Sequence, residues 1–206
     1  MNTLINTPIG DISNFVGMNG IMYYAEFSGE NQWQTNDYEL LCHVEEYDKD
    51  FDNNRYVNGR YKIIWKMSPK NDMEEIKLIC RLNTNFNVDI DNDNDECKSA
   101  RYITYKGTHL CIADEGDDGL LRRAYQNELL PERLVPWFEL QYTSGGYVVN
   151  SIAVTDDELG EEVYLPALKR GEVAEIKYAI AWKNDINTDW DADVSLGSEA
   201  YDFNVK

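Results

Sequence analysis

The chain of 206 residues carries 38 acidic against 19 basic side chains, which gives a formal net charge of −19. A surface of this sign repels the phosphates of nucleic acids and anionic lipids, so we expect no nucleic-acid partner and no membrane insertion, and we expect basic protein surfaces or cations instead. Hydrophobic residues make up 43% and aromatic residues 12%, enough to fill the core of one large all-β domain or of two small domains.

Three features of the sequence predict a cytoplasmic protein. No apolar run reaches the roughly 18 residues that a membrane-spanning helix needs. The N-terminal stretch MNTLINTPIGDISNFVGMNG lacks the basic start and the continuous apolar segment of a secretory signal. Cys42, Cys80 and Cys111 lie inside apolar runs, which is typical of reduced, buried thiols rather than of disulfides.

Alternating apolar and polar residues, rich in β-branched and aromatic side chains, recur along the chain and predict short strands. The predicted strands span residues 20–27, 38–47, 59–67, 76–82, 100–107, 108–113, 136–142, 147–154, 162–168, 174–183 and 192–198. Turn-forming segments such as NNRYVNG, SPKND and KRGE separate them. Short strands at this spacing are typical of an antiparallel β-sandwich, so we predict an all-β fold.

One segment has helical rather than strand periodicity. Residues 117–134, DDGLLRRAYQNELLPERL, place their apolar side chains three and four positions apart. Asp117 or Asp118 is suited to cap the start of a helix, and Pro131 would end it. We predict one short helix around 118–130 that covers a sheet edge.

A weak internal repeat bears on the number of domains. YKIIWK at 61–66 resembles YAIAWK at 178–183, and FNV occurs at both 86–88 and 203–205. We therefore predict two related β modules. The expected parts are an N-terminal arm at 1–19, a first module at 20–88, an acidic linker at 89–100 and a second module at 101–206. One large sandwich, with chance similarity between two of its strands, is the alternative.

The C-terminal region has the element order of a known module. Residues 164–198, YLPALKRGEVAEIKYAIAWKNDINTDWDADVSLGS, contain an apolar strand, a Gly-Glu turn, a strand ending in Trp, an Asp-rich loop and an alternating strand. That order resembles the C2-like β-sandwich module of calpain-type proteins, and residues 55–82 resemble it more faintly. The protease core of those proteins is absent from this chain. The resemblance implies a non-catalytic, eight-stranded sandwich whose acidic loops interact with cations.

Three Asp-x-Asp-x-Asp triplets, at 48–52, 89–93 and 189–193, are candidates for cation binding. Alternate residues of an extended backbone point the same way, and Ca²⁺ takes six to eight oxygen ligands. None of the triplets has the Gly at position six and the Glu at position twelve of an EF-hand. The candidate Ca²⁺ ligands are Asp189, Asp191, Asp193, Asp185, Asp48, Asp50 and Asp52. Solvated acidic turns are the alternative, and we favour them for all three triplets.

Two other chemistries have little support in the sequence. Cys42 with His43, and His109 with Cys111, lack the spacing of zinc-finger ligands. Neither histidine lies in a protease-like signature that would place a base beside a nucleophile. We therefore expect no zinc site and no catalytic residues.

Aromatic residues offer two further hypotheses. Trp33, Trp137 and Trp190 could stack on sugars beside two catalytic carboxylates, but with 38 acids in the chain no particular pair stands out. Trp190 is also flanked by Asp189 and Asp191, and a tryptophan in such a loop is a candidate partner-binding residue.

Together these patterns predict a non-enzymatic intracellular interaction or structural subunit that acts through acidic loops and β-sheet edges. We expect protein partners, an oligomer or larger assembly, and modulation by Ca²⁺ if the calpain-type resemblance holds. One alternative is an acidic viral or phage structural or inhibitor protein, located in the virion. The other is a small carbohydrate-active enzyme that uses two carboxylates.

Overall fold

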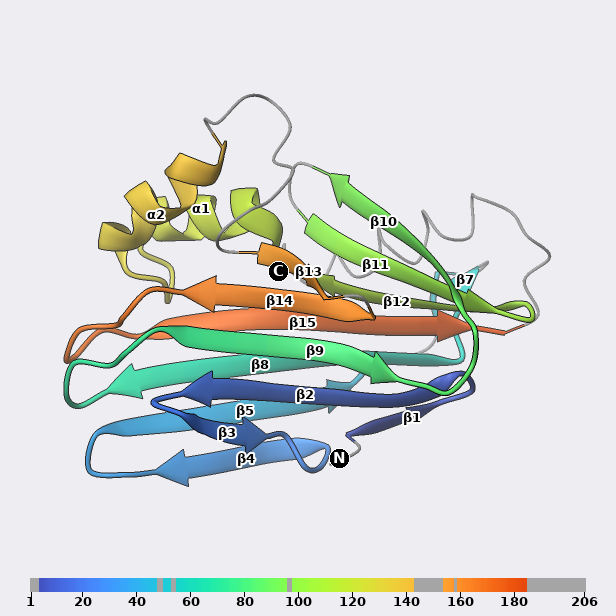
Figure 1. Ribbon diagram of the computed structural model, residues 1–206, viewed down its shortest axis with the longest axis horizontal. Coiled ribbons are helices and arrows are strands. Elements are labelled where there is room, and N and C mark those ends of the chain that lie inside the picture. Colours follow the sequence, from blue (N-terminus) through green and yellow to red (C-terminus); the bar gives the residue numbers. More distant parts are fainter. Residues whose placement is uncertain are drawn as a thin grey trace.

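A computed structural model describes residues 4–47, 50–52, 55–95, 98–142, 154–157 and 159–184 of the chain. The described strands are antiparallel and pack as two layered sheets, with two short helices at one end (Figure 1). The all-β sandwich predicted from the alternating sequence pattern is therefore confirmed. No helix among the described residues is long and apolar enough to cross a membrane.

The first layer is a six-stranded sheet, called sheet A. Its strands are β1 (Ile5–Thr7), β2 (Gly10–Met18), β3 (Ile21–Tyr24), β9 (Ile76–Asn83), β13 (Val154–Asp157) and β14 (Gly160–Leu165). The order is β1-β2-β9-β14-β13, and β3 pairs with β2 beyond the short stretch that β1 occupies. Both β1 and β3 therefore lie at the same edge of this sheet.

The second layer is a seven-stranded sheet, called sheet B, with the order β10-β11-β12-β15-β8-β5-β4. Its strands are β4 (Gly29–Gln34), β5 (Tyr38–Glu46), β8 (Gly59–Pro69), β10 (Asp89–Asp95), β11 (Lys98–Tyr105), β12 (Thr108–Asp114) and β15 (Ala174–Lys183). A separate hairpin joins β6 (Asp50–Asp52) and β7 (Arg55–Tyr56). Strand β15 lies in the middle of sheet B although it comes last among the described strands.

The core lies between the two sheets and follows from the period-two alternation of their strands. In β15 the side chains of Ile176, Tyr178 and Ile180 are almost fully buried against the opposite sheet. Alternate residues of a strand point to opposite faces, so every second residue meets the other layer. The outer face of sheet B also carries a small buried cluster, which includes Cys111 and Ala181.

The expected division into two modules conflicts with the strand pairing. Strand β9 of the first expected module pairs with β14 of the second, and β15 lies between β8 and β12. The expected arm at 1–19 contains β1 and β2, and the expected linker at 89–100 contains β10 and the start of β11. In β10, Asp at alternate positions suits a sheet-edge strand with one solvated face. The described strands form one sandwich.

The similar segments at 61–66 and 178–183 lie in β8 and β15, which are adjacent antiparallel strands with Ile63 opposite Tyr178. Both strands run through the centre of sheet B and bury one face in the core. A shared environment is enough to select similar alternating sequences. The second FNV, at 203–205, and the predicted strand at 192–198 lie outside the described residues.

The predicted short helix is present as α1 (Gly116–Gln126). The helix begins at Gly116, before Asp117 and Asp118, and the Asp114 carboxylate accepts a 2.7 Å hydrogen bond from the N–H of Gly116. The chain leaves the helix at Asn127, which adopts the left-handed conformation that asparagine tolerates.

Residues 136–142, predicted as a strand, instead belong to a second helix, α2 (Val135–Tyr142), which follows the 3₁₀ turn η1 (Glu132–Leu134). Pro136 lies in the first turn of α2, where a missing N–H is harmless. Leu134 and Phe138, four residues apart, are both buried in the main core. Tertiary burial on one helical face therefore outweighs the strand propensity of this aromatic segment.

The helical segment completes sheet B at the point where β12 ends. The first residues of β15 pair with β8 but not with β12. On the β12 side, their backbone groups therefore need other hydrogen-bond partners. The N–H of Glu175 donates to the Leu129 carbonyl at 2.8 Å, and the N–H of Lys177 donates to the Glu115 carboxylate at 3.1 Å. Arg123 donates to the Glu175 carbonyl at 3.0 Å. The helices thus replace a strand at this end of the sandwich (Figure 1).

Arg123 and Glu115 form the ion pair on which this helical segment depends. Arg123 Nη1 lies 2.7 and 2.6 Å from the two Glu115 carboxylate oxygens, and the side chains are only 7% and 2% exposed. We predict that Arg123→Ala lowers the free energy of unfolding by about 3–5 kcal/mol, because it leaves a buried carboxylate without its partner. Urea denaturation measures this loss.

Arg133→Ala provides the control, since Arg133 pairs with Glu172 where the side chains are 31% and 19% exposed. Its loss should be about 0–1 kcal/mol, as for other partly solvated pairs. Equal losses for the two variants would contradict the role assigned to Arg123.

Candidate interaction surface

The structure does not place most of the predicted Ca²⁺ ligands. Asp48, Asp185 and the triplet Asp189, Asp191 and Asp193 lie outside the described residues, and so does Trp190, the predicted partner-binding residue. Asp50 and Asp52 belong to β6, but only their backbone is described. Within the described ranges no group of three or more His, Cys, Asp or Glu side chains could hold a metal ion. Binding of Ca²⁺ by these aspartates stays a prediction.

The melting temperature tests the Ca²⁺ hypothesis. A ligand present at about ten times its Kd stabilises a protein by about 1.4 kcal/mol, so Ca²⁺ should raise Tm by about 3–6 °C and a chelator should reverse the rise. The triple variant Asp189→Asn, Asp191→Asn, Asp193→Asn should lose the effect. An unchanged Tm, or an equal rise in the variant, would remove this hypothesis.

Several polar side chains are buried between the sheets. They come from different strands: Asn14 from β2, Cys80 from β9, Asp114 from β12, Glu161 from β14 and Tyr178 from β15, and each is at most 1% exposed. Trp65 donates its indole N–H to the side-chain oxygen of Asn14 across the two layers. A cluster so deeply buried fixes the packing of the sheets and is closed to a substrate.

The electrostatics of this cluster are unsuited to nucleophilic catalysis. Burial, together with the charges of Glu161 and Asp114, raises the pKa of Cys80 to about 12. Burial also raises the pKa of Tyr178, with smaller contributions from Asp114 and Cys80. A catalytic thiol needs the opposite shift, toward the thiolate at neutral pH. Cys42, Cys80 and Cys111 are buried and are in no disulfide, as the sequence predicted.

Trp33 and Trp137, which were considered for sugar stacking, pack against the core instead. The Trp33 ring stacks on Trp65 at a centroid distance of 5.6 Å and meets the edge of Tyr23 at 5.8 Å. Tyr23 in turn hydrogen-bonds to Tyr38 through their hydroxyl groups. These rings close the sandwich between β3 and β4, so one face of Trp33 is occupied by protein.

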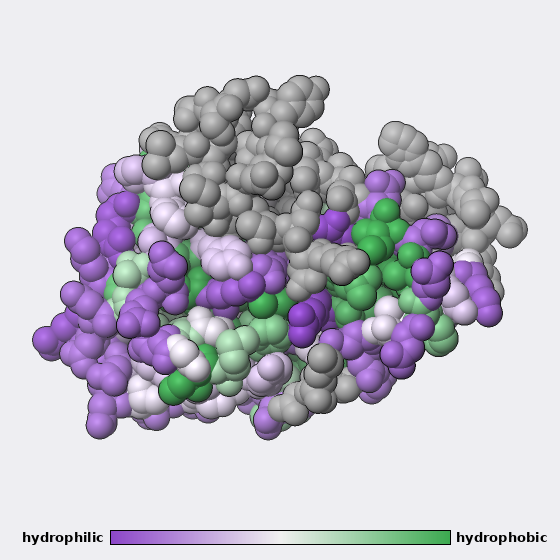
Figure 2. All heavy atoms as spheres, in the orientation of Figure 1, coloured by the Kyte–Doolittle hydropathy of each residue, from purple (hydrophilic) through white to green (hydrophobic). Residues whose placement is uncertain are grey.

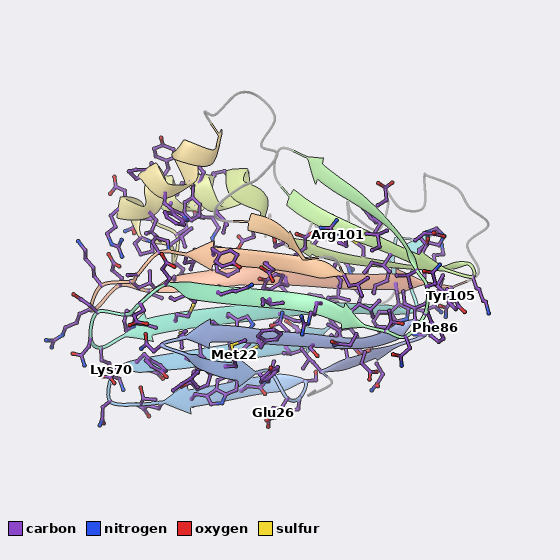
Figure 3. All side chains as sticks on the ribbon, viewed as in Figure 1. Met22, Glu26, Lys70, Phe86, Arg101 and Tyr105 are labelled. Carbon is purple, nitrogen blue, oxygen red and sulfur yellow. The ribbon has the colours of Figure 1, made fainter. Side chains whose placement is uncertain are left out.

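The outer surface of sheet A contains a groove of about 460 Å³ beside the β2–β3 hairpin. We call it the edge groove; it is lined by residues 17–22 together with Glu74, Glu75 and Lys77. Ile21 and Met22, in the edge strand β3, are 50% and 45% exposed. Figure 2 shows apolar surface over this side of the sheet, and Figure 3 marks Met22 there.

The backbone of the hairpin creates the edge groove. Asn19 and Gly20 both have positive φ angles, 50° and 74°, as the tight two-residue turn that joins twisted strands requires. The Met22 side chain lies over Gly17, where a Cβ atom would be only 2.9 Å from the Met22 sulfur. The Asn-Gly dipeptide between apolar residues was the sequence signal for this hairpin, which the predicted strand at 20–27 did not use.

The charges around the edge groove are acidic on balance. Lys77 pairs with Glu162 at 2.8 Å and lies 5.0 Å from the centre of the Tyr164 ring, so its charge is compensated within sheet A. Glu74 and Glu75 are exposed on the other side of the groove. The groove therefore offers an apolar strand with an acidic rim.

A second exposed apolar surface lies at the free edge of sheet B, beside β10. Phe86 and Ile90 are 46% and 41% exposed, and Phe86 stacks on Tyr105 with ring centroids 4.6 Å apart. Figure 2 shows a hydrophobic patch over β10 and β11, and Figure 3 places Phe86 and Tyr105 at the same end of the sheet. We call this surface, formed by Phe86, Asp89, Ile90 and Asp91, the β10 edge.

Comparison with known proteins gives a fold and no family. No family model matches the chain, and no curated protein matches it. The fold is similar to that of a solved chain described as "Putative kojibiose phosphorylase from human microbiome", with a TM-score of 0.54 and 7% sequence identity. The match covers 95% of this chain and 26% of that chain, so this chain spans about a quarter of that protein's length. At this identity the likeness shows the fold alone.

Proposed function

We propose that this protein is a non-enzymatic interaction or structural subunit and that the edge groove binds a protein partner. The observation that carries the proposal is the half-exposure of Met22, which lies over Gly17 in the groove, and of its neighbour Ile21, on the opposite face of the edge strand β3. Scattered exposed apolar residues are ordinary on protein surfaces. An apolar pair at an unprotected sheet edge is less common, because natural edges are normally blunted by charge, proline or a bulge.

Strand β3 has none of these protective features. Its sequence, Ile-Met-Tyr-Tyr, contains no charged residue and no proline, and within the described ranges it pairs with β2 alone. A partner that covers Ile21 and Met22 would remove this apolar area from water, which is worth roughly 25 cal/mol per Å². The acidic rim at Glu74 and Glu75, with the net charge of −19, favours a partner with a basic surface.

We also propose that the protein is intracellular and that Ca²⁺ modulates its binding. Binding of Ca²⁺ would neutralise acidic loops and so weaken the attraction of a basic partner. The resemblance to calpain-type C2-like modules supports a non-catalytic role of this kind.

Capture of partners from the native source tests the proposal. Met22→Lys replaces an apolar contact in the edge groove with a charge and should abolish partner binding, because the ammonium group repels a basic partner and must lose its water in the interface. Tyr125→Lys adds the same charge on α1, where Tyr125 is 56% exposed, and should leave binding intact. Quantitative mass spectrometry of the captured proteins, on variants with unchanged circular dichroism, measures the difference. Identical protein sets for both variants would contradict a partner at the edge groove.

A second candidate, an accessory part of a carbohydrate-acting assembly, is favoured by one observation. The similarly folded microbiome chain is named as a kojibiose phosphorylase, and this fold accounts for about a quarter of it. The same capture experiment separates the two candidates, because recovery of a carbohydrate-acting enzyme through the edge groove would favour the second. Asp114 and Glu161 are too deeply buried, at 1% and 0% exposure, to act on a sugar themselves.

A further inference from the structure

The β10 edge combines an open backbone with exposed apolar side chains. Among the residues that the structure describes, β10 pairs with β11 alone, so one row of its N–H and C=O groups faces away from the sheet. Phe86, just before the strand, and Ile90, within it, are each more than 40% exposed. An extended segment placed beside β10 would find backbone hydrogen bonds and apolar contacts together.

The two faces of β10 differ in chemistry. Ile90 is opposite Ile103, which is fully buried, so Ile90 continues the core-facing side of sheet B. Asp89 is opposite Thr104 and Asp91 is opposite Tyr102, on the outer face, and both aspartates are exposed.

This pattern selects among the segments that could pair with β10. A second copy of the strand would bring aspartates opposite aspartates, and like charges that face each other across strands are destabilising. If the aspartates served only to prevent pairing at this sheet edge, exposed apolar side chains such as Phe86 and Ile90 would not be expected beside them. An extended segment with basic residues on one face and apolar residues on the other would match both faces of β10.

We propose that β10 accepts an extended segment of a basic partner protein, which would add to the seven strands of sheet B as an eighth. Its Lys or Arg residues, at alternate positions, lie opposite Asp89 and Asp91, and its intervening apolar residues cover Ile90 and Phe86. This inference deepens the proposed interaction function and rests on it by naming the class of partner. It uses a different edge of the sandwich from the edge groove, so the two proposals can fail separately.

Binding of two synthetic peptides tests the proposal on the full chain. The first is fluorescein-labelled Lys-Val-Lys-Val-Lys-Val-Lys, and the second has the same composition in blocks, Lys-Lys-Lys-Lys-Val-Val-Val. Fluorescence anisotropy should show tighter binding of the alternating peptide, because only this one presents lysine and valine on opposite faces of a strand. Hydrogen exchange should slow in residues 89–95 when it binds.

Two matched pairs of variants locate the site. Ile90→Asn should weaken the alternating peptide by about fivefold, the upper range for one cross-strand pair, whereas Leu129→Asn should have no effect. Leu129 is 46% exposed and has a φ of 48°, which asparagine tolerates, so both variants should fold. Asp89→Asn should weaken binding more than Glu132→Gln, although each removes one negative charge.

Three results would overturn the proposal: no binding of the alternating peptide, equal binding of the two peptides, or equal effects within each pair of variants. The last two results would leave only general attraction to an acidic surface. None of the three would change the outcome expected for Met22→Lys in the capture experiment, so failure here and failure of the edge groove are distinguishable.

Discussion

Strand β15 hydrogen-bonds to β8 along one side and to β12 along the other, and the rest of the structure depends on this position. Removing β15 would divide sheet B into one part made of β4, β5 and β8 and another made of β10, β11 and β12. The same strand supplies Tyr178 and its apolar neighbours to the core between the sheets. Long-range pairing of this kind favours one folding unit over two modules.

The position of β15 also explains why the helices exist. Because β12 stops short of the start of β15, the backbone of Glu175 and Lys177 would be left without partners at a buried edge. The segment from Glu115 to Leu129 supplies those partners, and the buried pair between Arg123 and Glu115 holds the segment in place. The helices are therefore structural parts of the sandwich, and the surfaces left for other molecules are the sheet edges.

The functional hypothesis follows from the residues exposed at these sheet edges. At one side of the sandwich, β3 presents Ile21 and Met22 beside a groove, and at the far side of sheet B, β10 presents Ile90 between the exposed Asp89 and Asp91. The interior carboxylates are sealed in the core, where they fix the packing of the two sheets. An acidic molecule with open edges is suited to basic partner segments, which gain both charge contacts and strand pairing.

The strands with a clear apolar pattern were predictable from sequence, and those rich in turn-forming residues were not. In strands β5, β8, β9, β12 and β15 the apolar residues either alternate clearly with polar ones or form a continuous run. This spacing identifies them as strands. Strands β2, β4 and β10 are rich in Asn, Asp, Gln or Gly, and the same residues are typical of turns. Which strand lies at an edge depends on long-range pairing that a local pattern does not contain.

The candidate surface shows the same limit at the level of single residues. The Asn19-Gly20 turn was visible in the sequence, but the groove beside it needs Glu74 and Glu75, which come from a distant segment. The triplet that begins at Asp89 was noticed for its carboxylates, whereas its alternation with Ile90 carries the structural information. Spacing reveals a face of a strand, and only the fold reveals what lies opposite that face.

Hydrogen exchange in increasing urea, read separately for each strand by mass spectrometry, tests the single-sandwich account most directly. The account predicts that the β5–β8 half and the β12–β15 half of sheet B lose protection together, in one cooperative transition, because they share β15. Loss of protection in β12 and β15 at a urea concentration that leaves β5 and β8 protected would contradict it. That result would support two independently folding modules instead.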